Sequence, residues 1–277
     1  MDLIDILNYG FVQRAVIAGV LIAAICSMLG VFLVLRRFSL IGDGLAHVTF
    51  GSVALVLLIG VSPLYVTLAS LPIVVVSSLA IYKLTSSRRI HGDAAIGIVS
   101  SVGIAAGITL ASLSGGFNVD LFSYLFGNIL TVNTTEMFLS LGVFVLAAGM
   151  VIFFYSDLFA VTFDQELAKS MGVNTRRVNL MLFVLTAIAA VLAMRVAGIM
   201  MVSAMLILPP IAALQLSLSF KMTLLASVAV AVLSVILGIT AAFWLNLPVG
   251  ATIVIFNILF LFIIFAGRKL HQAIRTN

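Results

Sequence analysis

The sequence has very few charged residues. Asp, Glu, Lys and Arg together make up 8% of its 277 residues, against about 25% in an average soluble domain. Hydrophobic residues make up 64%, and the mean hydropathy is +1.34. We therefore expect an all-α integral membrane protein. At roughly 20 residues per spanning helix, residues 1–277 form a single transmembrane domain and leave no room for a soluble one.

Several motifs of enzymes are also missing. The chain has no G-x-x-x-x-G-K-[ST] loop for ATP phosphates, no H-E-x-x-H pair and no G-x-S-x-G elbow. It therefore cannot supply its own Walker-type ATP site, and we expect no enzymatic activity and no permanently bound cofactor. Cys26 is the only cysteine, which excludes an intrachain disulfide and a cysteine metal cluster.

The basic residues indicate the topology. The net charge is +5, but Lys and Arg occur in small clusters between apolar runs, which argues against nucleic acid as a partner. Apart from Arg14 and Arg195, all of them fall in loops or tails that we place inside the cell. The N-terminus is then outside and the C-terminus is cytoplasmic. We expect about nine spans, at residues 12–35, 39–60, 64–84, 94–113, 137–154, two within 180–218, 222–245 and 249–266.

Residues 180–218 form an apolar run that is too long for one span. Arg195 interrupts this run, and Pro209 and Pro210 follow it. We expect two spans that turn near Arg195, and without this turn the total falls to about eight. Span 94–113 is rich in glycine and other small residues, especially from Gly103 to Gly107. Such residues allow helices to approach closely, so we expect this helix in the interior.

Asp43 and His47 lie near the start of the second span. Ser39, which precedes them, is the expected N-cap of this helix. Residues four apart share one face of a helix, so the carboxylate and the imidazole can bind one metal ion or each other. Two ligands do not complete a metal site; a second copy of the chain about a two-fold axis would supply two more. The alternative is structural: Asp43 faces the helix dipole and His47 bonds a neighbouring helix.

A short amphipathic helix is expected in the inner segment 162–173. Leu167, Ala168 and Met171 are predicted to share one face, Glu166 and Lys169 lie on the other, and Gly172 ends the helix. Such a helix lies on the membrane surface or docks into a partner protein. Its mixed charge argues against an anchor in anionic lipid and favours a protein partner.

The outer stretch 114–136 contains no Lys or Arg, and we expect a loop with a short interfacial helix there. Asp120 and Glu136 are its only acids. They could attract cations at the outer mouth of a translocation path, although exposed loop acids without such a role are the common alternative.

Four parts of the sequence together resemble the permease subunits of bacterial ABC importers for zinc and manganese, the ABC-3 metal transporter family. They are Leu35 to His47, Gly92 to Ile98, Tyr124 to Leu130, and Phe163 to Gly172 together with Ala197 to Pro209.

The resemblance implies a homodimeric permease of the bacterial cytoplasmic membrane, with a fold like that of the vitamin B12 and siderophore (type II) importers. It also implies two copies of a cytoplasmic ABC ATPase and an extracytoplasmic metal-binding protein as partners. Asp43 and His47 would bind the transported metal. The coupling helix that docks into the ATPase would contain the following residues: Asp164, Glu166, Leu167, Ala168, Met171 and Gly172.

The identity of the metal follows less directly. The motif from Gly42 to His47 is closer to the zinc members, and no proline follows His47, whereas manganese members tend to have a Pro-Gly pair there. The Irving–Williams order also favours zinc over manganese at a given nitrogen and oxygen site. We expect zinc, with manganese or iron as the second choice. An ATPase-independent ion carrier and a permease for a larger metal chelate are the competing hypotheses.

Overall fold

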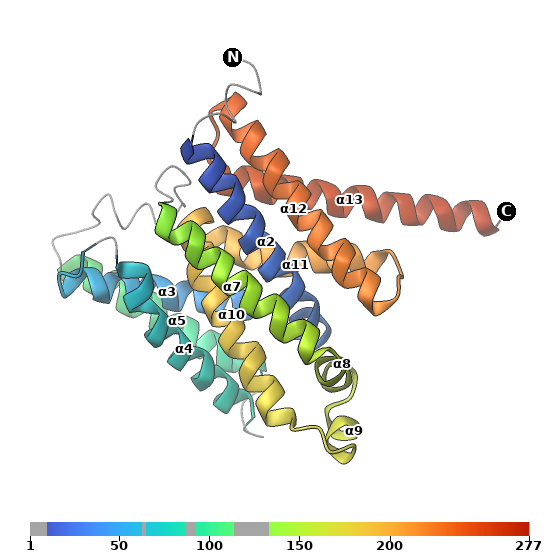
Figure 1. The fold of residues 1–277 in the computed structure, drawn as a ribbon, viewed down its shortest axis with the longest axis horizontal. Helices are drawn as coiled ribbons and strands as arrows, with labels where there is room; N and C mark the ends of the chain where they lie inside the picture. Colours follow the sequence, from blue (N-terminus) through green and yellow to red (C-terminus); the bar gives the residue numbers. More distant parts are fainter. Residues whose placement is uncertain (1–9, 63–64, 87–91, 114–132, 277) are drawn as a thin grey trace.

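The computed structural model describes residues 10–62, 65–86, 92–113 and 133–276, and within these ranges all regular structure is helical. The expected all-α fold is confirmed (Figure 1). Asp120 and the interfacial helix expected near it lie outside the described residues. The helices are α2 (Gly10–Leu35), α3 (Ile41–Leu58), α4 (Val66–Thr85), α5 (Gly92–Leu113), α7 (Thr134–Phe153), α8 (Tyr155–Phe163), α9 (Gln165–Ser170), α10 (Thr175–Ala197), α11 (Ile199–Gln215), α12 (Phe220–Leu245) and α13 (Val249–Thr276).

Eight of the described helices are long and apolar enough to cross a membrane: α2, α3, α4, α5, α7, α10, α12 and α13. The remaining long apolar helix, α11, has 17 residues. At 1.5 Å per residue it is about 25 Å long, whereas the hydrocarbon core of a bilayer is about 30 Å thick. The two helices expected between residues 180 and 218 are therefore both present, and the second is the shorter.

The break between α10 and α11 lies at Gly198, so the turn expected near Arg195 is confirmed to within three residues. Gly198 has φ 80° and ψ 171°, a backbone region that is essentially restricted to glycine. Arg195 lies within α10, and Pro209 and Pro210 lie inside α11. A glycine that can adopt this conformation sets the boundary, and neither the charge nor the proline pair does.

Helix α2 is the centre of the bundle. It packs against α7, α10, α11 and α12, and Figure 1 shows it between α7 and α12. Ile22, Leu29 and Phe32 on this helix are fully buried. In a bilayer the lipid tails are as apolar as these side chains, so close van der Waals packing holds such a helix in place.

Helices α3 and α5 approach each other closely through glycines. A Cβ atom at Gly103 would lie 2.7 Å from Cα of Val48, and one at Gly51 would lie 2.5 Å from the carbonyl oxygen of Gly103. The expected close approach is therefore confirmed. The expected interior position is wrong for the single chain, because Ile98, Val102 and Ile108 on the opposite face of α5 are exposed.

A tight turn places the start of α3. Arg37 adopts φ 60°, and the N–H of Phe38 donates to the carbonyl of Leu33 at 2.8 Å, as in a Schellman end of α2. The N-cap of α3 is Leu40, with no side-chain cap, so the expected cap at Ser39 is wrong. Because the turn itself orients the chain, Asp43 enters the first turn of α3 without a capping side chain.

Candidate metal site

Asp43 and His47 face the same side of α3. Nε2 of His47 lies 3.5 Å from Oδ2 of Asp43. The side chain of His47 is 22% exposed and that of Asp43 is 51% exposed. The helical spacing alone accounts for this proximity, because residues i and i+4 lie one turn apart. The pair is partly open to its surroundings, so an ion can reach it.

Ser203 of α11 completes the polar surroundings of Asp43. Its Oγ donates to Oδ1 of Asp43 at 3.4 Å. The two helices are close here because Gly42 has no side chain: a Cβ atom there would lie 2.6 Å from Cδ1 of Leu206 and 3.3 Å from Cα of Ser203. Sequence reasoning assigned no role to Ser203, although it lies within the Ala197 to Pro209 segment that carries the family resemblance.

His47 has one nitrogen without a hydrogen bond. Its Nδ1 is buried and has no partner among the described residues, whereas Nε2 lies on the side of Asp43. No group of three or more His, Cys, Asp or Glu residues able to hold a metal occurs in the described part of the chain. One chain therefore offers an imidazole, a carboxylate and a nearby hydroxyl, which is fewer protein ligands than a closed metal site normally has.

The segment 162–173, expected to couple to an ATPase, contains the last residues of α8 and the whole of α9. Asp164 caps α9 by accepting from the N–H groups of Glu166 and Leu167 at 3.0 and 2.9 Å. Gly172 follows with φ 85°, so the predicted short helix and its end at Gly172 are confirmed. Whether the segment binds an ATPase stays a prediction.

The predicted apolar face of this helix is wrong in one residue. Leu167 and Met171 are 58% and 70% exposed, but Ala168 is 1% exposed. Successive helical residues are rotated by about 100°, so Ala168 faces the protein when Leu167 and Met171 face away from it. Phe163 is also exposed. We call Phe163, Leu167 and Met171 the inner apolar patch.

Helix α8 is held in place by aromatic contacts. Phe159 and Phe163 lie with ring centroids 5.1 and 5.8 Å from that of Phe220, at the start of α12. Nζ of Lys221 lies 5.3 Å from the ring centroid of Tyr155. Edge-to-face and cation–π contacts of this kind fix the orientation of a short helix, so α9 projects from a firmly attached support.

Glu136 occupies a capping position. It is 7% exposed, its N–H donates to Oδ1 of Asn133 at 2.8 Å, and its Oε2 accepts from the N–H of Asn133 at 3.2 Å. This reciprocal arrangement is a capping box at the start of α7. A role for Glu136 at an outer mouth stays a prediction, as it does for Asp120.

A bundle of membrane-spanning helices, with a carboxylate–imidazole pair inside it and a capped helix projecting from one end, defines a polytopic transport protein. Residues 8–268 match the model of the ABC 3 transport family. The chain belongs to this family, as its sequence motifs indicated: it is a metal ABC permease of the cytoplasmic membrane, a transport component and not an enzyme.

Individual relatives agree with this assignment. The manganese transport system membrane protein MntC of Listeria innocua is 34% identical, over 94% of this chain and 91% of its own. A solved structure described as PsaBC from Streptococcus pneumoniae in complex with Fab matches with a TM-score of 0.83 and 31% identity, over 95% of this chain and 94% of that one. A putative metal-chelate type ABC transporter in an inward-facing conformation shares the fold, with a TM-score of 0.75 and 15% identity, over 92% and 85% of the two chains.

Proposed function

We propose that this chain moves a divalent transition-metal ion into the cytoplasm, with Asp43 and His47 as its ligands in the path. The observation that carries this proposal is the 3.5 Å approach of His47 Nε2 to Asp43 Oδ2 on a membrane-spanning helix. Ionisable groups within a membrane are expensive and mark ion pathways by default. Ser203 supports the assignment, because it adds an oxygen beside the carboxylate.

Manganese is the metal that we favour. The Listeria innocua relative is named a manganese transporter, and carboxylate and hydroxyl oxygens suit Mn²⁺. Zinc, the metal expected from the Gly42 to His47 motif, is the second candidate, because an imidazole beside a carboxylate binds Zn²⁺ more tightly in the Irving–Williams order. Delivery by a binding protein can override that order, and the order alone therefore does not decide the cargo.

The proposed partners are two copies of an ABC ATPase, an extracytoplasmic metal-binding protein and a second copy of this chain. The inner apolar patch supports an ATPase partner, because Phe163, Leu167 and Met171 are exposed beside a rigidly held helix. An incomplete ligand set in one chain supports a second copy, which would contribute its own Asp43 and His47.

Transport by the complete complex in proteoliposomes tests the proposal. We expect Mn²⁺ uptake driven by ATP, with competition by Zn²⁺ and Fe²⁺ measured in the same vesicles. Asp43→Asn and His47→Ala should abolish uptake while the complex still assembles. Asp93→Asn is the matched control, because it makes the same charge change at an exposed position on α5.

Unchanged uptake in Asp43→Asn and His47→Ala would reject the site. Transport by the permease alone, without the ATPase, would instead support an ion-coupled carrier. Uptake of a metal chelate that does not depend on Asp43 or His47 would support a chelate permease.

A further inference from the structure

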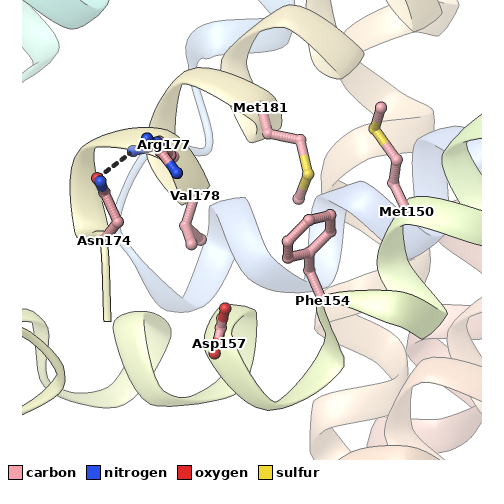
Figure 2. Close-up of a pocket in the computed structure, with 7 residues that line it drawn as sticks. All are labelled: Met150, Phe154, Asp157, Asn174, Arg177, Val178 and Met181. Carbon is pink, nitrogen blue, oxygen red and sulfur yellow. Dashed lines mark hydrogen bonds between the residues drawn. The ribbon is translucent and has the colours of Figure 1, made fainter. Parts of the chain in front are cut away.

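A pocket of about 370 Å³ lies at the inner end of the bundle, away from the candidate metal site. It forms where α7 ends, between α8 and the first turns of α10 (Figure 2). This volume is within the range of small-molecule pockets, about 300–1,000 Å³. The lining residues are Met150, Phe154, Asp157, Asn174, Arg177, Val178 and Met181.

The pocket has an apolar part and a charged part. Met150 and Phe154 come from the end of α7, and Figure 2 shows the ring of Phe154 beside the side chain of Met181. On α7 the adjacent Ile152 and Phe153 are 75% and 83% exposed, as expected for side chains that face hydrocarbon. Asp157 of α8 and Arg177 of α10 supply the charges. The apolar wall of the pocket continues into the exposed apolar surface of α7, and the two charges lie beyond the end of that helix. This arrangement suits an amphipathic ligand.

The two charges in the pocket have opposite signs and are not paired with each other. Asp157 and Arg177 both line it, and the structure records no ion pair between them. The Asn174 side chain accepts from the backbone N–H of Arg177 at 3.1 Å and caps α10. Arg177 therefore lies in the first turn of α10, where the helix dipole favours an anion. Its guanidinium lines the pocket and can bind a phosphate, and the carboxylate of Asp157 can bind an ammonium group.

We propose that this pocket binds the headgroup of a membrane phospholipid that carries both a phosphate and a primary ammonium group. The phosphate lies at Arg177 and the ammonium at Asp157. The acyl chains leave past Phe154 and Met150 along the exposed surface of α7. This assignment does not depend on which metal the permease moves or on the role of Asp43 and His47.

Lipid retention tests this site. The complete complex is reconstituted in nanodiscs with equal amounts of phosphatidylethanolamine and phosphatidylglycerol, re-extracted in detergent, and its bound lipids are quantified by mass spectrometry. We expect retention of phosphatidylethanolamine in excess over phosphatidylglycerol. Arg177→Gln should lower its retention about fivefold, as expected for the loss of one exposed charge-assisted contact. Asp157→Asn should remove the preference for the ammonium headgroup.

Arg176→Gln is the matched control, because Arg176 is exposed, adjacent in sequence and absent from the pocket lining. Its lipid retention should equal that of the unaltered protein. Equal retention of the two lipids by the unaltered complex would overturn the proposal, and so would unchanged retention in Arg177→Gln. Displacement of the lipid by inorganic phosphate alone would show a site for free anions and overturn the proposal, and so would the absence of retained lipid in the assembled complex.

Discussion

Arg36, one residue beyond the end of α2, donates a hydrogen bond from Nη2 to Oδ1 of Asn179 in α10, 143 positions later in the chain. Asn179 is buried, and its Nδ2 donates to Oε1 of Gln165 in α9 at 3.5 Å. Burial lowers the pKa of Arg36 to about 10, so the guanidinium remains charged at neutral pH. Two side-chain hydrogen bonds therefore connect the turn that leads into the Asp43 helix with the helix expected to couple to the ATPase.

The first prediction concerns this connection. Asn179→Leu should destabilise the permease by about 1.5–3 kcal/mol, because it leaves a charged, largely buried guanidinium without its acceptor. Nη1 of Arg36 already has no partner among the described residues, so no second bond compensates. Thermal unfolding of the purified permease in detergent measures the loss.

A double-mutant cycle separates the bond from general packing. Arg36→Met with Asn179→Leu should cost less than the sum of the two single changes, because neither buried polar group then remains unpaired. Arg37→Gln is the control for charge, since Arg37 is exposed. Strict additivity of the two single changes would show that the bond contributes nothing to stability.

The second prediction concerns the inner apolar patch and depends on the proposed function. Leu167→Asp and Met171→Asp should each weaken ATPase binding at least about tenfold, because exposed apolar side chains at the centre of an interface lose their packing when they are replaced by charges. Co-purification of the ATPase with the permease measures this. Metal uptake should fall in proportion to the bound ATPase.

Lys169→Ala is the control within the same helix, because it removes an exposed side chain outside the patch. Gly172 gives an independent test. Its φ of 85° is accessible to Asn but costly for β-branched residues, so Gly172→Val should weaken ATPase binding and Gly172→Asn should retain it. Normal co-purification of Leu167→Asp and Met171→Asp would exclude the patch as the docking surface.

The third prediction concerns the contact of α3 with α5. Gly103→Ala should destabilise the permease by about 1–3 kcal/mol and reduce uptake, because the added Cβ lies 2.7 Å from Cα of Val48 and 2.9 Å from the carbonyl carbon of His47. Gly97→Ala is a matched control on the same helix, since a Cβ there meets nothing within 4 Å. Equal unfolding temperatures for the two variants would contradict the close packing.

Local features of the sequence predicted the fold well. The lengths of the apolar runs predicted the membrane-spanning helices. The four-residue spacing of Asp43 and His47 predicted that they lie together, because it corresponds to one helical turn. The end of α9 at Gly172 was likewise a local property of glycine. These features depend on backbone geometry within a few residues, which a single sequence contains.

Features that depend on packing were not predictable in the same way. Ser203 reaches Asp43 from a position 160 residues away. The residues next to Ser203 in the sequence do not predict that its hydroxyl contacts Asp43. The apolar pattern could not tell that Ala168 faces the protein, because its size suits either side of a helix. Arg195 marked the region of the break between α10 and α11, but the charge did not identify Gly198 as the residue at which the backbone turns.

Ser203 allows the last prediction, which tests whether the oxygen beside Asp43 influences the choice of metal. Ser203→Cys replaces a hydroxyl, which suits Mn²⁺, with a thiol that forms stronger bonds to Zn²⁺ as the thiolate. If the metal binds at Asp43 and His47, this change should shift uptake competition towards zinc, and Ser203→Ala should weaken manganese uptake without that shift. Ser234→Ala is the control, because the Ser234 hydroxyl bonds only the Val230 carbonyl of its own helix. An unchanged preference in Ser203→Cys would place the ion away from Ser203, on the other side of Asp43, where a second copy of the chain would have to supply the remaining ligands.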